Sequence, residues 1–207
     1  MCQRKGAILK RIPVDDKGQL DLESLKKLLS PRTKLVCVAH ISNVLGIVNP
    51  ISKIASIVHS SGALMLVDGA QGIVHCNVNV QELGADFYAF SGHKVYAAPG
   101  TGVLYGRREL LDQLPPYRGG GEMIQSVSWE HTSYAEVPQR FEAGTQNISG
   151  TPTLVPALEL AGAMNNSSVI KEEESLIRDY VHKEFADRPH IHLFGRPDDI
   201  SEKVNLY

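Results

Sequence analysis

Cysteine is scarce in this chain, which has three among its 207 residues: Cys2, Cys37 and Cys76. A small, odd number argues against a disulfide framework and is typical of a reducing compartment, so we expect a cytoplasmic protein. No apolar run approaches the ~18–20 residues that a membrane helix needs. No apolar signal-peptide core follows residues 1–6. We therefore expect no association with a membrane.

An excess of one charge is also missing, because 21 Lys and Arg residues face 23 Asp and Glu residues, a net charge of −2. A nucleic-acid or membrane-surface binder needs a basic excess, so neither partner is expected. Hydrophobic residues make up 43% of the chain, which is ordinary for a globular protein. The length allows one or two domains with a sizeable core.

Segments typical of strands and helices alternate along the first two thirds of the chain. The predicted strands are residues 7–14, 35–39, 64–67, 87–90, 103–105 and 190–194. The predicted helices are residues 21–29, 50–60, 80–83, 153–164 and 169–185. Because residues 35–39 are all apolar, we expect that strand to be buried on both faces. Residues 115–150 predict long loops. The alternation predicts an α/β fold with a mainly parallel sheet flanked by helices.

Polar side chains follow three of the predicted strands, where ligands gather in open α/β sheets. They are His40 and Asn43, then Asp68 and Gln71, then Ser91, His93 and Lys94. If the three strands are neighbours, these groups meet at one edge of the sheet. The sequence therefore predicts a polar site assembled from three separate segments.

Each of these residues also has an ordinary structural interpretation. Lys94 could be a solvated surface lysine, or an amine made nucleophilic by apolar walls that lower its pKa and able to form a Schiff base. Asp68 could cap a helix or form a turn, or could face a cationic ring nitrogen. Gln71 could be a surface amide, or could hold a phenolate oxygen. His93 could be a core histidine with satisfied hydrogen bonds, or could take part in catalysis.

Taken together and in this order, the motifs resemble the class V aminotransferase superfamily, and in particular its group II cysteine desulfurase/selenocysteine lyase branch. The segments that carry the resemblance are His40-Ile41-Ser42-Asn43-Val44-Leu45-Gly46, Val67-Asp68-Gly69-Ala70-Gln71, Ser91-Gly92-His93-Lys94, Gly102-Val103-Leu104-Tyr105-Gly106, Gly119-Gly120-Gly121-Glu122-Met123-Ile124 and Arg140-Phe141-Glu142-Ala143-Gly144-Thr145. The pairing of Ser-Gly-His-Lys with an upstream Asp-Gly-Ala-Gln is highly specific. The likeness covers residues 1–150 and continues more loosely beyond them.

The resemblance implies the large domain of a fold-type I enzyme that uses pyridoxal 5′-phosphate (PLP). It makes Lys94 the lysine that links covalently to the cofactor and then moves a proton on the substrate, with His93 as a second catalytic candidate. It pairs Asp68 with the pyridine nitrogen. The remaining implied cofactor contacts are Gln71 to the phenolic oxygen, Asn43 at the ring edge, Ser91 and His93 to the phosphate, and Thr145 to the phosphate of the partner subunit in a homodimer. No metal site is expected.

The sequence departs from the branch at two places. Ile47 stands where Thr is usual, and residues 95–100 read Val-Tyr-Ala-Ala-Pro-Gly where Leu-Tyr-Gly-Pro-Thr-Gly is usual. Because Ala97 replaces a glycine, we expect the loop beside Lys94 to change its shape. We read Cys2 and Cys37 as structural, and Cys76 as a weak candidate for a reactive thiol. None of the three matches the sulfur-accepting cysteine of the branch.

The expected domains are residues 1–150, the central part of a PLP-binding large domain, and residues 151–207, a helical remainder that starts the C-terminal small domain. We expect the fold to be incomplete at both ends, with a strand-like segment at residues 204–206 by the end of the chain.

The expected activity is that of a PLP-dependent cysteine desulfurase, which converts L-cysteine to L-alanine and passes sulfur to an acceptor protein, as in iron-sulfur cluster assembly. We expect this chain to be a fragment of such an enzyme that lacks the catalytic cysteine. The alternatives are another class V enzyme (a selenocysteine lyase, an aminotransferase or an epimerase), a non-catalytic fragment, or a cofactor-free Schiff-base lyase. The pair of Asp68 and Gln71 argues against the last, since a lyase without the cofactor has no ring nitrogen to stabilise.

Overall fold

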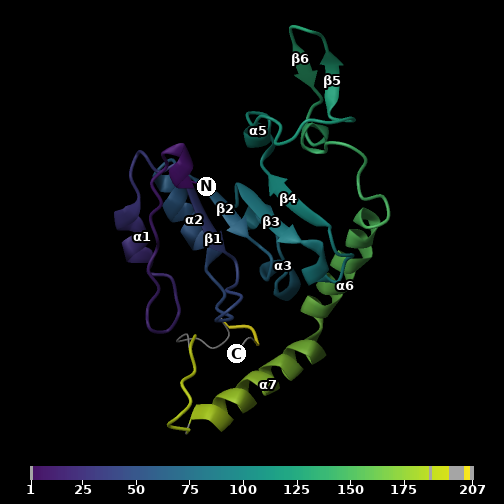
Figure 1. Ribbon diagram of the computed structural model, residues 1–207. Helices are drawn as coiled ribbons and strands as arrows, with labels where there is room; N and C mark the ends of the chain where they lie inside the picture. Colours follow the sequence, from purple (N-terminus) through teal and green to yellow (C-terminus); the bar gives the residue numbers. More distant parts are fainter. Residues whose placement is uncertain (1, 187, 196–202, 206–207) are drawn as a thin grey trace.

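A computed structural model describes residues 2–186, 188–195 and 203–205 of the chain (Figure 1). Its centre is a four-stranded sheet in the order β1-β2-β3-β4. The strands are β1 (Leu35–Ala39), β2 (Leu64–Asp68), β3 (Phe87–Ser91) and β4 (Gly102–Gly106). β1, β2 and β3 are parallel, while β4 runs antiparallel to β3. The predicted α/β fold with a mainly parallel sheet is confirmed.

The helices around the sheet begin and end at residues with the expected local chemistry. α1 (Leu22–Leu28) starts after Asp21, whose side chain accepts a hydrogen bond from the Ser24 N–H. α2 (Ile51–Ser60) follows Pro50, and the chain then turns at Gly62 with φ of 75°. α4 (Val80–Leu83) is capped by Asn79. Sequence signals for helix ends therefore hold in this half of the chain.

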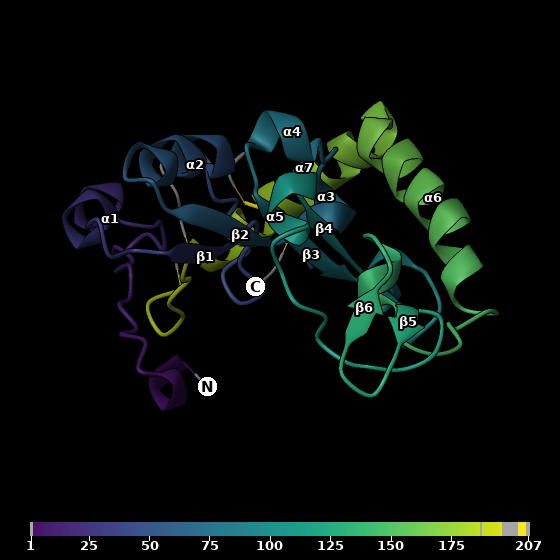
Figure 2. The ribbon, with the colours of Figure 1, turned by 90° about the horizontal axis from the view of Figure 1, so that it is seen from above.

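The main hydrophobic core lies between one face of the sheet and these helices. Figure 2 shows α2 and α4 on the same side of the sheet. Val36 and Met65 from the strands pack in one buried cluster with Leu25 of α1 and with Ile54 and Val58 of α2. The removal of these apolar side chains from water is the main stabilising contribution to the fold.

The prediction that residues 35–39 are buried on both faces is wrong. Burial alternates along β1, where Val36 and Val38 are buried but Leu35 is 46% exposed and Cys37 is also exposed. β1 is an edge strand of this sheet. Alternation follows because successive side chains of a strand point to opposite faces, and the helices of the core cover one of them.

A second sheet was not predicted. Within the segment expected to form loops, β5 (Ile124–Val127) pairs antiparallel with β6 (Thr132–Tyr134). This hairpin extends away from the central sheet (Figure 1), and Trp129 at its turn is fully exposed. Its base is linked to the end of α5 (Arg108–Leu111) by Arg140, which donates to the carbonyl oxygens of Ala135 and Asp112 at 3.1 and 3.0 Å.

The later part of the chain contains the long helices. η4 (Thr151–Thr153) leads into α6 (Leu154–Asn166), which packs against α3 (Gly72–His75) and against η2 (Gly92–Val95). α7 (Ser168–Ala186) follows and extends along the lower side of the molecule in Figure 1. The remaining short elements are η1 (Cys2–Lys5) and η3 (Gln139–Phe141).

Two further predicted strands are wrong. Residues 7–14 are irregular apart from a bridge between Val14 and Leu20, and Ile8 and Leu9 are 78% and 65% exposed. Residues 190–194 contain a turn and irregular chain. Apolar, β-branched composition predicted both, but composition cannot supply the neighbouring strand that a sheet requires. Of the segment 204–206, Leu206 lies outside the described residues, and the preceding Lys203 bridges Ile47.

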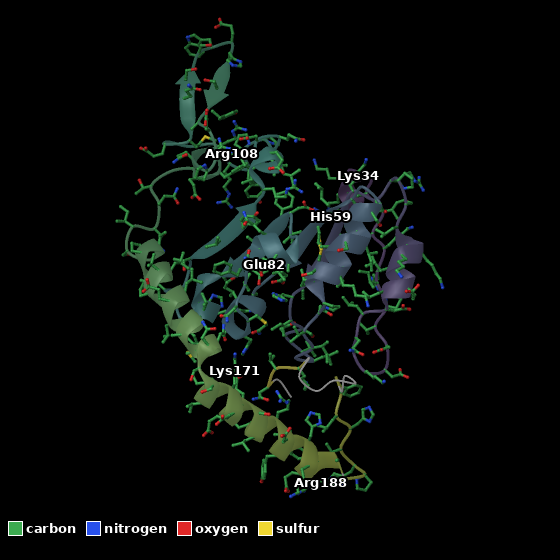
Figure 3. The ribbon with its side chains drawn as sticks, turned by 180° about the vertical axis from the view of Figure 1, so that it is seen from behind. Lys34, His59, Glu82, Arg108, Lys171 and Arg188 are labelled. Atoms are coloured by element: carbon green, nitrogen blue, oxygen red, sulfur yellow. The ribbon has the colours of Figure 1, made fainter. Side chains whose placement is uncertain are left out.

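A buried carboxylate holds together the edge of the sheet where β3 begins. Asp86 has no exposed side-chain surface, and it accepts hydrogen bonds from His59 Nε2 at 2.8 Å, Arg107 Nη1 at 3.0 Å and the Met65 N–H at 2.7 Å. Burial by itself would raise the pKa of Asp86, but these donors outweigh it and lower the pKa below its usual value. His59 is labelled at the end of α2 in Figure 3. The cluster joins α2, β2 and β3 at the edge opposite the predicted site.

Candidate active site

The three predicted groups of polar residues do share one edge of the sheet, which we call the rim. Because β1, β2 and β3 are parallel neighbours, their carboxyl ends lie side by side. Ala39 pairs with Asp68, and Asp68 pairs with Ala89, in one row across the sheet. The His40 N–H donates to the Asp68 carbonyl and the Gly69 N–H to the Ala89 carbonyl, both at 2.8 Å. The loops that follow the strands therefore start next to one another.

His40 and Tyr88 form a buried pair directly next to the rim. His40 Nδ1 lies 3.0 Å from the Tyr88 hydroxyl oxygen, and the two side chains are 6% and 1% exposed. Burial lowers the pKa of His40 and raises the pKa of Tyr88 well above its ordinary value, so both stay neutral at pH 7. Sequence reasoning placed His40 at the rim but missed its partner Tyr88.

Two glycines let the chain after β2 lie directly on this pair. A Cβ atom at Gly69 would lie 1.9 Å from Cε1 of Tyr88, and one at Gly72 would lie 2.3 Å from Nδ1 of His40. No side chain fits at such distances, so these positions require glycine. The spacing of Gly69 and Gly72 around Gln71 was the available signal of a close backbone approach.

Asp68 ends β2 with its side chain exposed at the rim. Its Oδ1 accepts a hydrogen bond from the Ala70 N–H at 3.0 Å. This is the contact of a turn-forming aspartate, and it also fixes the carboxylate in one orientation. Gln71 is half-buried directly before α3, which starts at Gly72. Both residues thus lie where the sequence placed them.

Lys94 lies in η2, the single turn that follows β3. The turn is packed tightly, since Val95 is fully buried and a Cβ atom at Gly92 would lie 2.1 Å from Oγ1 of Thr101. Lys94 itself is half-buried and His93 is exposed. α3 and α6 both contact this turn. Ser91, the last residue of β3, is half-buried beside it.

The unusual residues after Lys94 do not force a strained alanine. The positive φ angles of this loop fall at Tyr96 (69°) and Gly100 (81°), whereas Ala97 has none. The Ala97 N–H donates to the Gly92 carbonyl at 3.0 Å, and the Ala98 N–H donates to Oγ1 of Thr153 at 2.9 Å. Ala97 therefore avoids the positive φ that an alanine disfavours, and the strained residue of the loop is Tyr96. The expected change in the shape of this loop stays a prediction.

Asn43 and Thr145 differ in how the topology places them. Asn43 is exposed in the loop that follows β1 and so belongs to the rim. Thr145 is exposed on the connection between η3 and η4, which returns from the hairpin to α6 (Figure 1). It follows no strand of the central sheet. The chain thus brings six of the seven predicted residues to the rim, namely Asn43, Asp68, Gln71, Ser91, His93 and Lys94.

Neither of the two cysteines whose side chains the structure describes is arranged as a nucleophile of this rim. Cys37 lies on the exposed face of β1, and Cys76, directly after α3, is half-buried. Burial raises the pKa of the Cys76 thiol, which disfavours the reactive thiolate. The side chain of Cys2 lies outside the described residues.

The groups at the rim fit PLP by their chemistry. A fixed, exposed carboxylate suits a protonated ring nitrogen, and a half-buried amine suits an aldehyde carbon. A hydroxyl and an imidazole suit a phosphate, and amide side chains suit the oxygen and the edge of a ring. These groups come from three different strand ends, as a ligand in the crevice of an open α/β sheet requires.

Comparison with known proteins gives a consistent result. The family model described as Aminotransferase class-V matches residues 1–205. A cysteine desulfurase of Dickeya dadantii is 45% identical over 196 residues, which is 94% of this chain and 47% of the relative. A probable cysteine desulfurase of Mycolicibacterium paratuberculosis is 46% identical over 93% of this chain and 28% of the relative.

Solved structures of cysteine desulfurases share the fold. The apo structure of the enzyme from Thermococcus onnurineus superposes with a TM-score of 0.85 at 34% identity, covering 98% of this chain and 50% of that one. An Escherichia coli cysteine desulfurase superposes with a TM-score of 0.81 at 36% identity, covering 91% and 47%. The chain thus spans half or less of the length of these relatives.

Proposed function

Because the chain belongs to the class-V aminotransferase family, we propose that its rim binds PLP as part of a cysteine desulfurase. The observation that carries this proposal is that Asp68 ends β2 while Lys94 lies in the turn directly after β3, its parallel neighbour. The names of relatives at about 45% identity support cysteine as the substrate. The overall reaction would convert L-cysteine to L-alanine and transfer the sulfur to an acceptor.

The chemistry that PLP supplies when bound is that of an electron sink for the substrate. Asp68 would pair with the ring nitrogen and keep it protonated, because an opposite charge favours the cationic form. Lys94 would hold the cofactor through its amine, and would then carry a proton to and from the substrate carbon. The role of second catalytic residue remains a proposal for His93.

The other rim residues would orient the cofactor. Ser91 and His93 offer hydrogen-bond donors for the phosphate, and an anion is held best by such donors. Gln71 would contact the phenolic oxygen, and Asn43 the edge of the ring. The buried His40–Tyr88 pair and the tight contacts of Gly69 fix the backbone that carries these groups.

Several properties of the whole protein belong to this proposal. We propose a homodimer in which Thr145 reaches the partner's phosphate, a sulfur-acceptor protein, a place in iron-sulfur cluster assembly, and a cytoplasmic site of action. Within the described residues no helix has the length and apolar character of a membrane span. The exposure of Thr145 on its connection is compatible with contact to another subunit.

We also propose the division into a PLP-binding large domain, residues 1–150, and a segment starting the small domain, residues 151–207. The central sheet lies wholly in the first part. α6 belongs to the second part but packs on α3 and η2, so the two parts touch beside the Lys94 turn.

Titration of the purified chain with PLP tests the cofactor assignment. We expect a visible absorption band that appears with the wild type and is missing from Lys94→Ala, with Lys171→Ala on the exposed side of α7 as control. No band in the wild type would favour a fragment without cofactor. If the band forms, supplying L-cysteine, selenocysteine or other amino acids and assaying alanine and sulfide or selenide separates a desulfurase from the other class V enzymes.

A further inference from the structure

A buried lysine near the end of the described chain contacts the loop that carries Asn43. We call residues 40–49 the Asn43 loop. Lys203 is only 2% exposed, and its Nζ donates a hydrogen bond to the Leu45 carbonyl oxygen. Burial lowers the pKa of this amine. A lysine is rarely buried unless it is held by a specific partner, so its place under this loop requires a reason.

The Asn43 loop is well ordered by its own contacts. The Ser42 N–H donates to the Ile47 carbonyl at 2.9 Å and the Gly46 N–H donates to the Ser42 carbonyl at 3.0 Å. The hydroxyl of Ser42 accepts from the Leu45 N–H at 3.1 Å. Ile47 is 2% exposed. These hydrogen bonds close the loop on both sides of Asn43, so a shift of Leu45–Ile47 would also move Asn43.

Three segments that are distant in the sequence pack against Leu45–Ile47 of this loop. A Cβ atom at Gly18 would lie 2.7 Å from Cδ1 of Leu45, and one at Gly195 would lie 2.8 Å from the Leu45 carbonyl oxygen. Lys203 bridges Ile47, and the Val204 N–H donates to the Gly46 carbonyl at 2.9 Å. Figure 1 shows this C-terminal piece, in yellow, directly against the loop below β1.

The same segment is tied to α7. Asn205 Nδ2 donates to the carbonyl oxygen of Glu174 at 3.0 Å. A continuous chain of contacts therefore runs from α7 through residues 203–205 to the Asn43 loop. Ile47, at which the sequence departs from the branch, takes part in this series of contacts through its bridge to Lys203.

We propose that Lys203 is a positioning residue, which holds Asn43 in place for the cofactor through its hydrogen bond to Leu45. This rests on the proposed function, since it assumes that Asn43 faces bound PLP. Lys203 contacts the loop through Leu45, so it would act on the cofactor through Asn43. The affinity of the rim for PLP then depends on a contact between Leu45 and a residue 158 positions away in the sequence.

Hydrogen exchange and PLP binding test this on the full chain. In Lys203→Met we expect the amides of Leu45 and Gly46 to exchange roughly tenfold faster, the factor that loss of a charged hydrogen bond typically brings. The affinity for PLP should fall roughly fivefold or more. Lys203→Arg, which keeps a charged donor, should lie between the variant and the wild type. Lys171→Met, on α7 (Figure 3), should match the wild type in both measurements.

Unchanged exchange in the loop of Lys203→Met would overturn the proposal, and so would faster exchange with unchanged PLP affinity. If that variant does not fold, hydrogen exchange of the wild type with and without PLP tests the proposal instead. Binding and loop order are reciprocal, so added PLP should slow exchange of the Val204 amide, and an unchanged rate would overturn the proposal. Failure of the wild type to bind PLP at all would instead contradict the proposed function.

Discussion

Removal of the Asp86 carboxylate should cost this chain much of its stability. In Asp86→Ala the Met65 N–H loses its acceptor in the fully buried core, and an unsatisfied buried donor costs about 1–3 kcal/mol. His59 and Arg107 also lose their partner, but their side chains are 38% and 48% exposed and can turn to water. We therefore expect a loss near the lower end of the ~3–5 kcal/mol typical of a broken buried pair.

Urea unfolding of Asp86→Ala and of Asp112→Ala measures this difference. Asp112 pairs with Arg108 on the surface, where an ion pair contributes little, so its removal should hardly change the free energy of unfolding. If the free energy of unfolding of Asp86→Ala falls by only about 0.5 kcal/mol, the size of a surface substitution, the buried contacts of Asp86 do not stabilise the fold as predicted.

The stabilising effect of the Asp86 carboxylate should depend on pH in a definite direction, which a second variant, Asp86→Asn, can test. The pKa of Asp86 is lowered in the folded chain from 3.8, so its stabilising effect is complete well above that pH and is lost as the pH falls through the folded pKa. The stability gap between the wild type and Asp86→Asn should narrow on acidification. A gap that stays constant down to acid unfolding would contradict the assignment.

Two further predictions concern the rim. Tyr88→Phe should lower the free energy of unfolding in urea by about 1–3 kcal/mol, because His40 Nδ1 is left buried without its partner; an unchanged value would exclude that role. Asp68→Asn should keep the wild-type unfolding free energy, because an amide oxygen can still accept from the Ala70 N–H. Its PLP affinity, measured by absorbance titration, should nevertheless fall roughly tenfold or more, the factor for 1.4 kcal/mol, and an unchanged affinity would remove Asp68 from the site.

The central sheet could be predicted because its signals are local. Apolar runs at residues 64–67 and 87–90 matched strands to within one residue, and the helices expected at residues 50–60 and 80–83 matched α2 and α4 equally well. The rim followed from these strands by topology alone, since parallel neighbours end at one edge. Fold and rim could therefore be worked out before any coordinates.

What failed depends on partners far away in the chain. Residues 7–14 have strand composition but no adjacent strand to pair with among the described residues, and the hairpin at residues 124–134 has a polar, exposed surface without a strong apolar pattern. The contact of Tyr88 with His40 and that of Lys203 with Leu45 join residues 48 and 158 positions apart. No periodicity in the sequence encodes such pairs.

The most direct test of the proposed role of Lys94 is to locate the cofactor on the chain. The chain would be saturated with PLP, reduced with borohydride, digested with a protease and mapped by mass spectrometry. We expect a single peptide that carries the reduced cofactor, with the modification on Lys94. Modification of other lysines without Lys94, or no modified peptide, would contradict it.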